Sequence, residues 1–142
     1  FALGVALNET GLAANLINAI PFNTWPVLAV LIGSGVICYT LSNFISNTAT
    51  AALLVPILAV VGKSMTAELA PIGGVACLLI GIAVAASVAM ILPISTPPNA
   101  LAHGTGMIEQ KYMAKSGLIM GIIGLVLGYS MLVLLGSIGF FG

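Results

Sequence analysis

The sequence contains no arginine and no aspartate, and its only charged residues are three lysines and three glutamates among 142 residues. A soluble domain carries charge on about a quarter of its residues, so this scarcity excludes a soluble globular protein. Hydrophobic residues instead make up 61% of the chain, and the mean hydropathy is +1.26. Since a chain in lipid must satisfy its own backbone hydrogen bonds, the long apolar runs predict an all-α membrane protein.

The same absences exclude several classes of function. No basic patch is present to neutralise phosphate groups, so we expect no nucleic-acid partner. Cys38 and Cys77 both lie in apolar runs, which indicates packing residues rather than a disulfide or a metal pair. The apolar segments contain no HExxH motif, no Ser/His/Asp set and no paired carboxylates. We therefore expect neither an enzyme nor a bound cofactor.

The N-terminal region is apolar from its first residue. It has no initial Met, no charged n-region and no small-residue cleavage site, so it is not a signal peptide. We expect a fragment that lacks an N-terminal portion. The sequence predicts the end of a helix at residues 1–7. It also predicts a short amphipathic segment at the membrane interface over residues 12–20. Trp25, which lies between Pro21 and Pro26, suits the level of the lipid headgroups.

Two polar breaks interrupt the apolar chain, one at residues 42–50 and one at residues 95–99. Hydrocarbon cannot solvate an amide or a hydroxyl, so each unpaired polar group there costs several kcal/mol. Such a cluster persists only where it is buried against protein, lines a cavity or binds a ligand. We interpret the two breaks as the two halves of one binding site within the membrane.

The first break predicts a re-entrant helical hairpin over about residues 26–62. The apolar run at residues 27–44 is barely long enough to cross a bilayer, and the run at 51–61 is too short. Two undersized runs around a polar tip are typical of a hairpin that enters and leaves on one side. The alternative is one long helix with a polar patch, ending at Pro56.

The second break predicts a broken transmembrane helix over about residues 72–110. Pro93, Pro97 and Pro98 remove backbone donors and clash with the preceding turn, so a helix that runs to about Leu92 must stop there. We expect it to resume after the prolines.

The C-terminal region predicts a last transmembrane helix over about residues 116–140. Its glycines have the small-xxx-small spacing that permits close helix contact; they are Gly117, Gly121, Gly124 and Gly128. Residues 62–71 and 109–115 are expected to be aqueous loops. Lysine is commoner in the second loop, which makes it cytoplasmic by the positive-inside rule. The hairpin then enters from outside a cell (inner) membrane that the chain crosses several times.

Each break ends one helix and begins another. Ser46, Asn47 and Thr48 are good residues to cap a helix N-terminus, and Thr96 followed by Pro97 repeats this arrangement. A helix N-terminus carries about half a positive charge and unpaired N–H donors, so the two starts predict an anion site. Without arginine, a carboxylate would be bound by these neutral donors alone.

The helix ends before the breaks predict a cation site beside the anion site. The ends near Phe44 and Leu92 are expected to leave carbonyl groups unpaired. Together with the oxygens of Ser42 and Asn47, such carbonyls could coordinate a hard cation such as Na⁺. Broken helices that bind an anion and a cation together are the architecture of secondary transporters.

These residues also resemble a known family. Ser46-Asn47-Thr48 resembles the Ser-Asn-Thr signature of the divalent anion:sodium symporters, which are dicarboxylate and citrate carriers. Residues 92–100 resemble that family's second-half Pro-x-x-Thr-Pro-Pro-Asn loop. The resemblance covers essentially the whole fragment and implies that residues 1–142 are the C-terminal repeat of the transport domain, half of an inverted-repeat transporter.

The resemblance implies roles for particular residues. The sodium ligands it implies are the side chains of Ser42 and Asn47 and the main-chain carbonyls of Ile45 and Ser95. The substrate-binding residues it implies are Ser46, Asn47, Thr48, Thr96 and Pro97. It also places a second signature, another sodium site and the scaffold helices that form a homodimer in the missing part.

We therefore expect a secondary active transporter that couples Na⁺ to a dicarboxylate or related divalent anion by alternating access. One alternative is a sodium-independent dicarboxylate exchanger, or a carrier of sulfate, citrate or arsenite on a related fold. A different class is a non-transporting membrane subunit in which the polar breaks only pack against a partner.

The histidine and the asparagines each have a purely structural interpretation as well as a functional one. His103 could exchange a proton or touch substrate, but a lone histidine near a helix end is more often simply hydrogen-bonded. For Asn47 and Asn99 the plain reading is helix capping, which is compatible with ligand binding. Asn43 is a weaker candidate for the site than Asn47.

Overall fold

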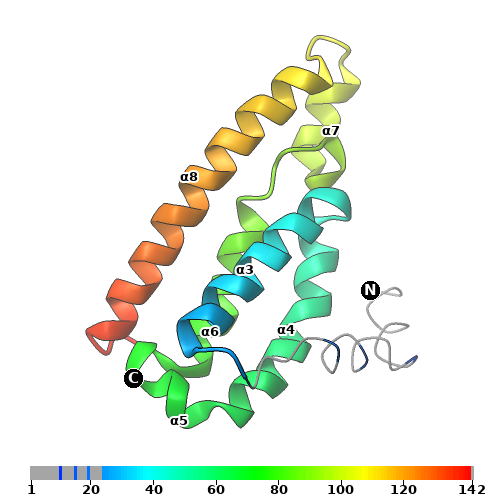
Figure 1. Cartoon of the computed structure of the whole chain (residues 1–142). Coiled ribbons are helices and arrows are strands. Elements are labelled where there is room, and N and C mark those ends of the chain that lie inside the picture. Colours follow the sequence, from blue (N-terminus) through cyan, green and yellow to red (C-terminus); the bar gives the residue numbers. More distant parts are fainter. Residues whose placement is uncertain (1–9, 11–14, 16–18, 20–23, 142) are drawn as a thin grey trace.

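A computed structural model of the chain describes Thr10, Asn15, Ala19 and residues 24–141. Every regular element among these residues is a helix, as the sequence predicts (Figure 1). The elements are α3 (Val27–Phe44), α4 (Asn47–Ser64), α5 (Thr66–Leu69), η2 (Ala70–Ile72), α6 (Gly74–Ser87), η3 (Pro93–Ser95), α7 (Pro97–Gly104) and α8 (Gln110–Ser137). The helix end predicted at 1–7 lies outside the described residues, as does the segment at 12–20 apart from Asn15 and Ala19.

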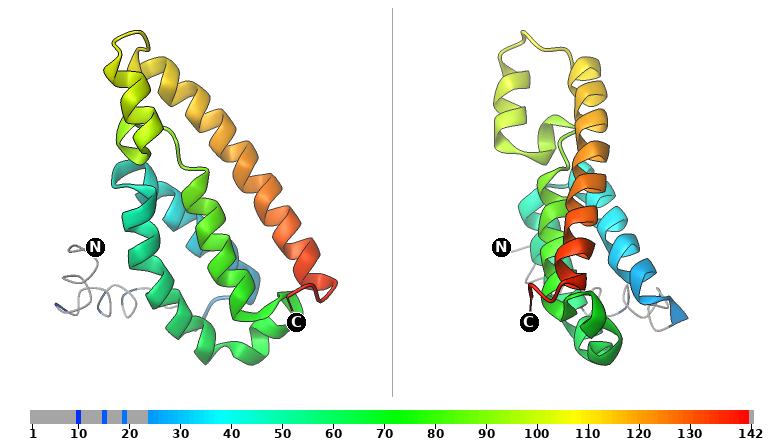
Figure 2. Two further views of the ribbon diagram at one scale, coloured as in Figure 1. Left: turned by 180° about the vertical axis from the view of Figure 1, so that it is seen from behind. Right: turned by 90° about the vertical axis from the view of Figure 1, so that its left-hand side faces the viewer.

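Helices α3 and α4 form a hairpin. They run in opposite directions, pack against each other and both pack against α6 (Figures 1 and 2). The chain leaves helical conformation at Ile45 (φ −105°, ψ −95°) and is extended at Ser46 (φ −163°, ψ 154°). The alternative of one continuous helix is therefore wrong, and Pro56 lies inside α4 instead of ending it.

The segment predicted as an aqueous loop at 62–71 is largely helical. Helix α4 continues to Ser64, and α5 and η2 follow almost without interruption. The physical reason is burial, because Met65 and Leu69 are both inserted into the core. Gly73 then takes a positive φ of 101°, and the chain bends by 70° into α6. A positive φ strains residues with a Cβ atom, so glycine suits this bend.

The core lies between α3, α4 and α6. Its fully buried members include Leu31, Leu78 and Ile82. Cys38 and Cys77 are buried and free, and their thiols donate to the carbonyls of Ile82 (3.5 Å) and Leu132 (3.9 Å). The prediction that both cysteines are packing residues is confirmed.

Helix α8 is the longest element and packs along α6. Its 28 residues span about 42 Å. It begins at Gln110, earlier than the predicted 116, because the polar residues at its start are good helix formers and extend it beyond the apolar run. Its glycines allow close contact, as predicted. A Cβ atom on Gly128 would lie 2.6 Å from a methyl group of Val84 in α6, and one on Gly124 would lie 2.8 Å from a methyl group of Val88, the residue after α6.

Two tyrosine rings hold α8 against its neighbours. One ring extends from α3 to α8, and the other extends from α8 to α3 and α6. The Tyr39 ring of α3 packs directly against Gly121 of α8. The Tyr129 ring of α8 fills the space that Gly35 of α3 and Gly81 of α6 leave open. Each ring therefore occupies space on the facing helix that is open only because the residue there is glycine.

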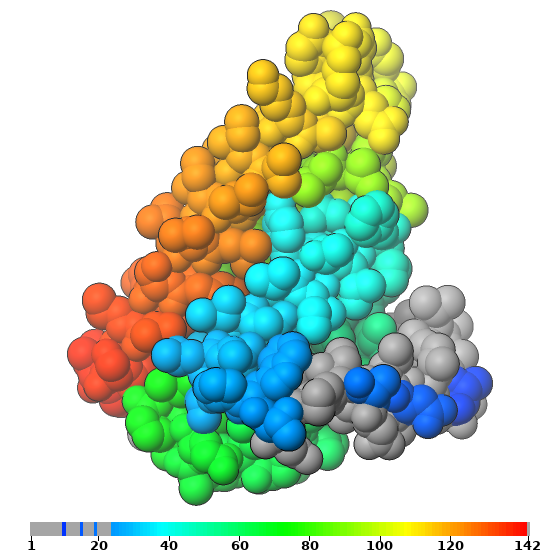
Figure 3. Space-filling view, in the orientation of Figure 1, coloured from blue at the N-terminus to red at the C-terminus, as the bar shows by residue number. Residues whose placement is uncertain are grey.

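The outer face of the described chain is apolar. Helices α3, α4 and α8 are each long and apolar enough to cross a membrane, by length and composition. In the space-filling view of Figure 3, α8 and α3 lie side by side over much of one face. Their exposed side chains include Leu28, Ile32, Val126, Leu127 and Met131. Such a continuous apolar surface fits a multi-pass membrane protein.

Candidate functional site

The two polar breaks lie beside each other in the folded chain. The turn between α3 and α4 meets the segment between α6 and α7 partway along α8 (Figures 1 and 2). Helix α3 packs against η3, which lies within that second break. The two breaks are therefore neighbours in the folded chain.

Asn43, near the end of α3, joins the two breaks. Its side chain is 3% exposed. The Asn43 amide nitrogen donates to the Tyr39 carbonyl at 2.8 Å, and its amide oxygen accepts from the Ile91 N–H at 2.8 Å. The Asn43 carbonyl accepts from the Ser95 hydroxyl at 3.2 Å. One buried residue therefore fixes the hairpin tip, Ile91 and Ser95 relative to one another.

The second break is wider than the prolines alone predict. Helix α6 ends at Ser87 rather than near Leu92. The physical reason is that side chains of other segments bond the backbone N–H and C=O groups that a continued helix would otherwise pair. Ile91 N–H donates to Asn43, and the Met90 carbonyl accepts from the Asn99 amide at 3.0 Å. The expectation of free carbonyls at the helix ends is wrong for Asn43 and Met90, whose carbonyls accept side-chain bonds.

Both predicted helix caps are present. The Ser46 hydroxyl accepts from the Ala49 N–H at 3.2 Å and begins α4. The Thr96 hydroxyl accepts from the Asn99 N–H at 3.3 Å, and α7 then begins at Pro97. Each cap satisfies only one of the first N–H groups of its helix. At α4, the first-turn N–H groups that the cap does not satisfy and the helix dipole favour an anion. At α7 only the dipole does so, because Pro97 and Pro98 have no N–H and the N–H groups of Asn99 and Ala100 are bonded to Thr96.

Three buried oxygens near the hairpin tip have no hydrogen-bond partner among the described residues. They are Ser42 Oγ, Asn47 Oδ1 and Thr50 Oγ1. Ser42 and Thr50 are fully buried. A buried polar atom without a partner costs about 1–3 kcal/mol. A set of neutral oxygens of this kind suits a hard cation, which prefers oxygen ligands.

The structure distributes the predicted cation ligands over both breaks. Ser42 lies on the buried face of α3 near its end, Ile45 lies in the turn, and Asn47 begins α4. Ser95, which is 1% exposed, lies across the interface and is bonded to α3 through Asn43. The Asn43 carbonyl thus holds the Ser95 side chain against the end of α3.

The predicted substrate residues lie at two helix starts. Ser46, Asn47 and Thr48 lie at the start of α4, and Thr96 and Pro97 lie at the start of α7. The side chains of Thr48 and Pro97 are exposed. No hydrogen bond within the described part of the chain joins the one group directly to the other.

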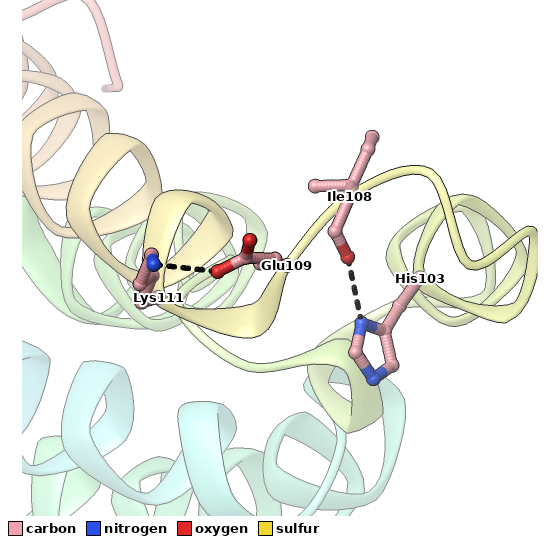
Figure 4. A network of polar contacts seen from close by, with 4 residues as sticks. All are labelled: His103, Ile108, Glu109 and Lys111. Atoms are coloured by element: carbon pink, nitrogen blue, oxygen red, sulfur yellow. Dashed lines mark hydrogen bonds and ion pairs between the residues drawn. The ribbon is translucent and has the colours of Figure 1, made fainter.

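His103 lies away from this site. Its ring Nδ1 is 3.2 Å from the Ile108 carbonyl, so the histidine closes the loop between α7 and α8 (Figure 4). Glu109 and Lys111 form an exposed ion pair at 2.6 Å beside it. This agrees with the structural interpretation, in which His103 is simply hydrogen-bonded near a helix end.

Sequence reasoning treated Asn43 as a weaker candidate and did not single out Thr50. Asn43 stood out only as an amide in the last turn of an apolar helix. Thr50 falls three residues after Asn47 and so shares its face of α4. The sequence position of Asn43 or Thr50 does not reveal which element packs against it. That neighbouring element decides whether the side chain is buried.

Comparison with known proteins shows which family the chain resembles in sequence. The family model described as "Sodium:sulfate symporter transmembrane region" matches residues 1–139. The chain is 35% identical over 133 residues to Na(+)/dicarboxylate cotransporter 3 of Rattus norvegicus, covering 89% of this chain and 20% of that protein. It is 35% identical over 127 residues to the sodium-dependent dicarboxylate transporter SdcS of Staphylococcus saprophyticus, covering 88% and 23% respectively.

A further relative is an uncharacterized transporter of Haemophilus influenzae, 38% identical over 123 residues. That match covers 85% of this chain and 25% of the relative. The chain thus spans about a fifth to a quarter of the length of these proteins. The family is one of transporters, not enzymes. With its Ser-Asn-Thr and Thr-Pro-Pro-Asn segments and a family model that matches residues 1–139, the chain belongs to the divalent anion:sodium symporter family.

Proposed function

We propose that the protein containing this chain is a secondary active transporter that carries a dicarboxylate together with Na⁺ by alternating access. The observation that carries this proposal is that the buried oxygens of Ser42, Asn47 and Thr50 have no partner among the described residues, in a hairpin whose second helix and its neighbour α7 both have capped N-termini. The names of the rat and staphylococcal relatives, which are a cotransporter and a sodium-dependent transporter of dicarboxylates, support the choice of ligands.

The cation is bound by oxygens from both breaks. The side chains of Ser42 and Asn47 provide two ligands, and the main-chain carbonyls of Ile45 and Ser95 provide two more. Because Asn43 bonds to Ser95 and to Ile91, both sides of this site are preorganised. Preorganised ligands lose little conformational freedom on binding.

The anion is bound where α4 and α7 begin. The residues in contact with it are Ser46, Asn47, Thr48, Thr96 and Pro97. Each helix start contributes about half a positive charge, and the cation beside it adds a full one. Asn47 can serve both ligands, because its amide carries an acceptor oxygen and a donor nitrogen. This shared residue couples binding of the anion to binding of Na⁺.

The hairpin is re-entrant, and the chain is one half of an inverted-repeat transport domain. In support, α3 and α4 have 18 residues each and so span about 27 Å, and their tip reaches only partway along α8 (Figure 1). Lys63 lies at the end of α4 away from the tip, and Lys111 lies near the start of α8. The loop with Lys111 faces the cytoplasm, and the protein is a homodimer in the cell (inner) membrane.

The proposal is tested by Asn47→Ala in the full-length protein. Sodium-driven succinate uptake into proteoliposomes should be abolished, since the variant removes a ligand of both anion and cation. Thr40→Ala is the matched control, because Thr40 is an exposed residue of the same hairpin and bonds only to its own helix at Val36. Uptake near the wild-type rate in Asn47→Ala refutes the proposal.

Two alternatives are separated by related measurements. A sodium-independent exchanger keeps its uptake when Na⁺ is replaced by choline. The family model is described by sodium and sulfate, so sulfate is a second candidate anion, and competition between sulfate and succinate distinguishes the two. A non-transporting subunit shows no thermal stabilisation by dicarboxylate plus Na⁺.

A further inference from the structure

We propose that Thr50 supplies an additional oxygen ligand to the cation site and helps to set its affinity for Na⁺. This inference rests on the proposed function and adds a residue to that site. It starts from a contrast between Thr50 and the other hydroxyl side chains of the helices.

Most hydroxyl groups in these helices donate to a carbonyl of their own helix. Thr40 donates to Val36 at 2.8 Å, Ser87 to Ala83 at 2.7 Å and Ser130 to Val126 at 2.6 Å. This bond satisfies the hydroxyl within its own helix. Thr50 makes no such bond, although its own N–H donates to the Ser46 carbonyl at 2.9 Å. Its hydroxyl is therefore oriented away from the local acceptor.

Burial makes this orientation costly without a ligand. Thr50 is 0% exposed, and its Oγ1 has no partner among the described residues. Valine has nearly the same shape as threonine and would fill the same space without an unsatisfied oxygen. A threonine at this position is physically reasonable if its oxygen has a partner that the protein itself does not provide.

The hairpin places Thr50 level with the other unpartnered oxygens. Ser42 lies four residues before the turn residue Ser46, and Thr50 lies four residues after it. In a hairpin of two antiparallel helices, such positions lie at a similar distance from the tip. Asn47 is three residues before Thr50 and shares its face of α4. Ser42, Asn47 and Thr50 thus lie within about one helical turn of the tip and carry neutral oxygens without a partner among the described residues. A small hard cation is the ligand that suits such oxygens.

The test compares Thr50→Val with Thr50→Ser in the purified full-length protein. Thermal unfolding is followed over a series of NaCl concentrations at constant ionic strength, with choline chloride as the replacement. In choline, Thr50→Val should unfold at the wild-type temperature or above it, since it removes an unsatisfied hydroxyl. In Na⁺, its half-saturating concentration should rise about tenfold or more, the loss typical when a group that supports a metal site is removed. Thr50→Ser should restore it.

Thr40→Val is the matched control, because its hydroxyl is exposed and bonded to Val36. It should keep the wild-type sodium dependence. The inference is overturned if Thr50→Val keeps the wild-type half-saturating concentration, or if it loses stability equally in choline and in Na⁺.

The same series separates this inference from the proposed function. If Asn47→Ala abolishes the sodium response and Thr50→Val does not change it, only the role of Thr50 is wrong. If the wild-type protein shows no sodium response, the proposed function and the role of Thr50 fail together.

Discussion

At the scale of single residues, the site depends on side chains that replace helix hydrogen bonds. Asn43 uses its amide nitrogen, its amide oxygen and its carbonyl, and two of these bonds reach across to the second break. Asn99 similarly satisfies the Met90 carbonyl. These bonds let the chain stay non-helical between α6 and α7 without leaving its buried backbone groups unpaired.

Asn43→Ala should be strongly destabilising for this reason. The variant leaves the buried Ile91 N–H without its acceptor, which costs about 1–3 kcal/mol. Ser95→Ala removes only the bond to the Asn43 carbonyl and should cost less. Thermal unfolding of the full-length protein should therefore rank the midpoints as Thr40→Ala, then Ser95→Ala, then Asn43→Ala, from highest to lowest.

The half-saturating Na⁺ concentration for uptake should also increase in Asn43→Ala, because Ile91 loses its bond to the hairpin tip and the chain leading to Ser95 is held less firmly. The bond from the Ser95 hydroxyl is kept, since it goes to the main-chain carbonyl of residue 43. A variant that unfolds earlier but keeps the wild-type sodium dependence would assign Asn43 to stability alone.

The sequence predicts some of these residues and not others, for a physical reason. Caps are local, so Ser46 and Thr96 could be recognised from their place before a helix and beside a proline. The bonds of Asn43 cross 48 and 52 residues, and no local pattern contains such a partner. Thr50 is significant only because its face of α4 is buried, which the sequence does not reveal.

At the scale of elements, the break between α6 and α7 is supported from α8. A Cβ atom on Gly117 would collide with the Met90 carbonyl and lie 2.9 Å from the Ile91 Cα. Both are backbone atoms, which cannot turn aside as a flexible side chain can. Gly117 therefore holds α8 against the same stretch that Asn43 and Asn99 bind.

Gly117→Ala should displace this stretch and lower both stability and transport. Overpacking of this kind costs about 1–3 kcal/mol. Gly104→Ala is a matched control, because a Cβ atom there would meet nothing within 4 Å. The measurements are thermal unfolding and initial rates of succinate uptake. Equal behaviour of the two alanine variants would contradict the close contact between α8 and the break.

Element boundaries show where sequence reasoning stops. The span of α3 and the start of α4 were predictable, because an apolar run ends at a polar cluster with good caps. The end of α6 was not, because tertiary hydrogen bonds, rather than the prolines, decide that it stops at Ser87. Helices α5 and η2 were also missed, because Met65 and Leu69 are too few to give a periodic signal, yet both are buried.

At the scale of the whole molecule, the membrane-embedded, all-helical class follows from composition alone. What composition cannot give is the arrangement of α8 against the hairpin. That arrangement depends on Tyr39 against Gly121 and on Tyr129 against Gly35 and Gly81. Each contact joins residues from distant parts of the chain.

Tyr129→Ala should loosen the whole bundle, while Tyr129→Phe should not. The alanine variant empties the space at Gly35 and Gly81 that the half-buried Tyr129 ring fills. Loss of a fully buried aromatic ring costs about 3–5 kcal/mol, which is the upper limit for this variant. The phenylalanine variant keeps the ring and removes a buried hydroxyl that has no partner among the described residues. Its unfolding temperature should equal or exceed that of the wild type. A lower temperature would indicate a partner for this hydroxyl elsewhere in the full-length protein.

The crossed tyrosines also have a mechanical consequence. With one ring inserted from each side, α8 can neither slide along α3 nor rotate on its axis without first withdrawing both rings. The tip, the broken helix and the last helix must then travel together as one rigid unit. Any motion that opens the site to one side of the bilayer and then to the other belongs at the borders of that unit, not inside it.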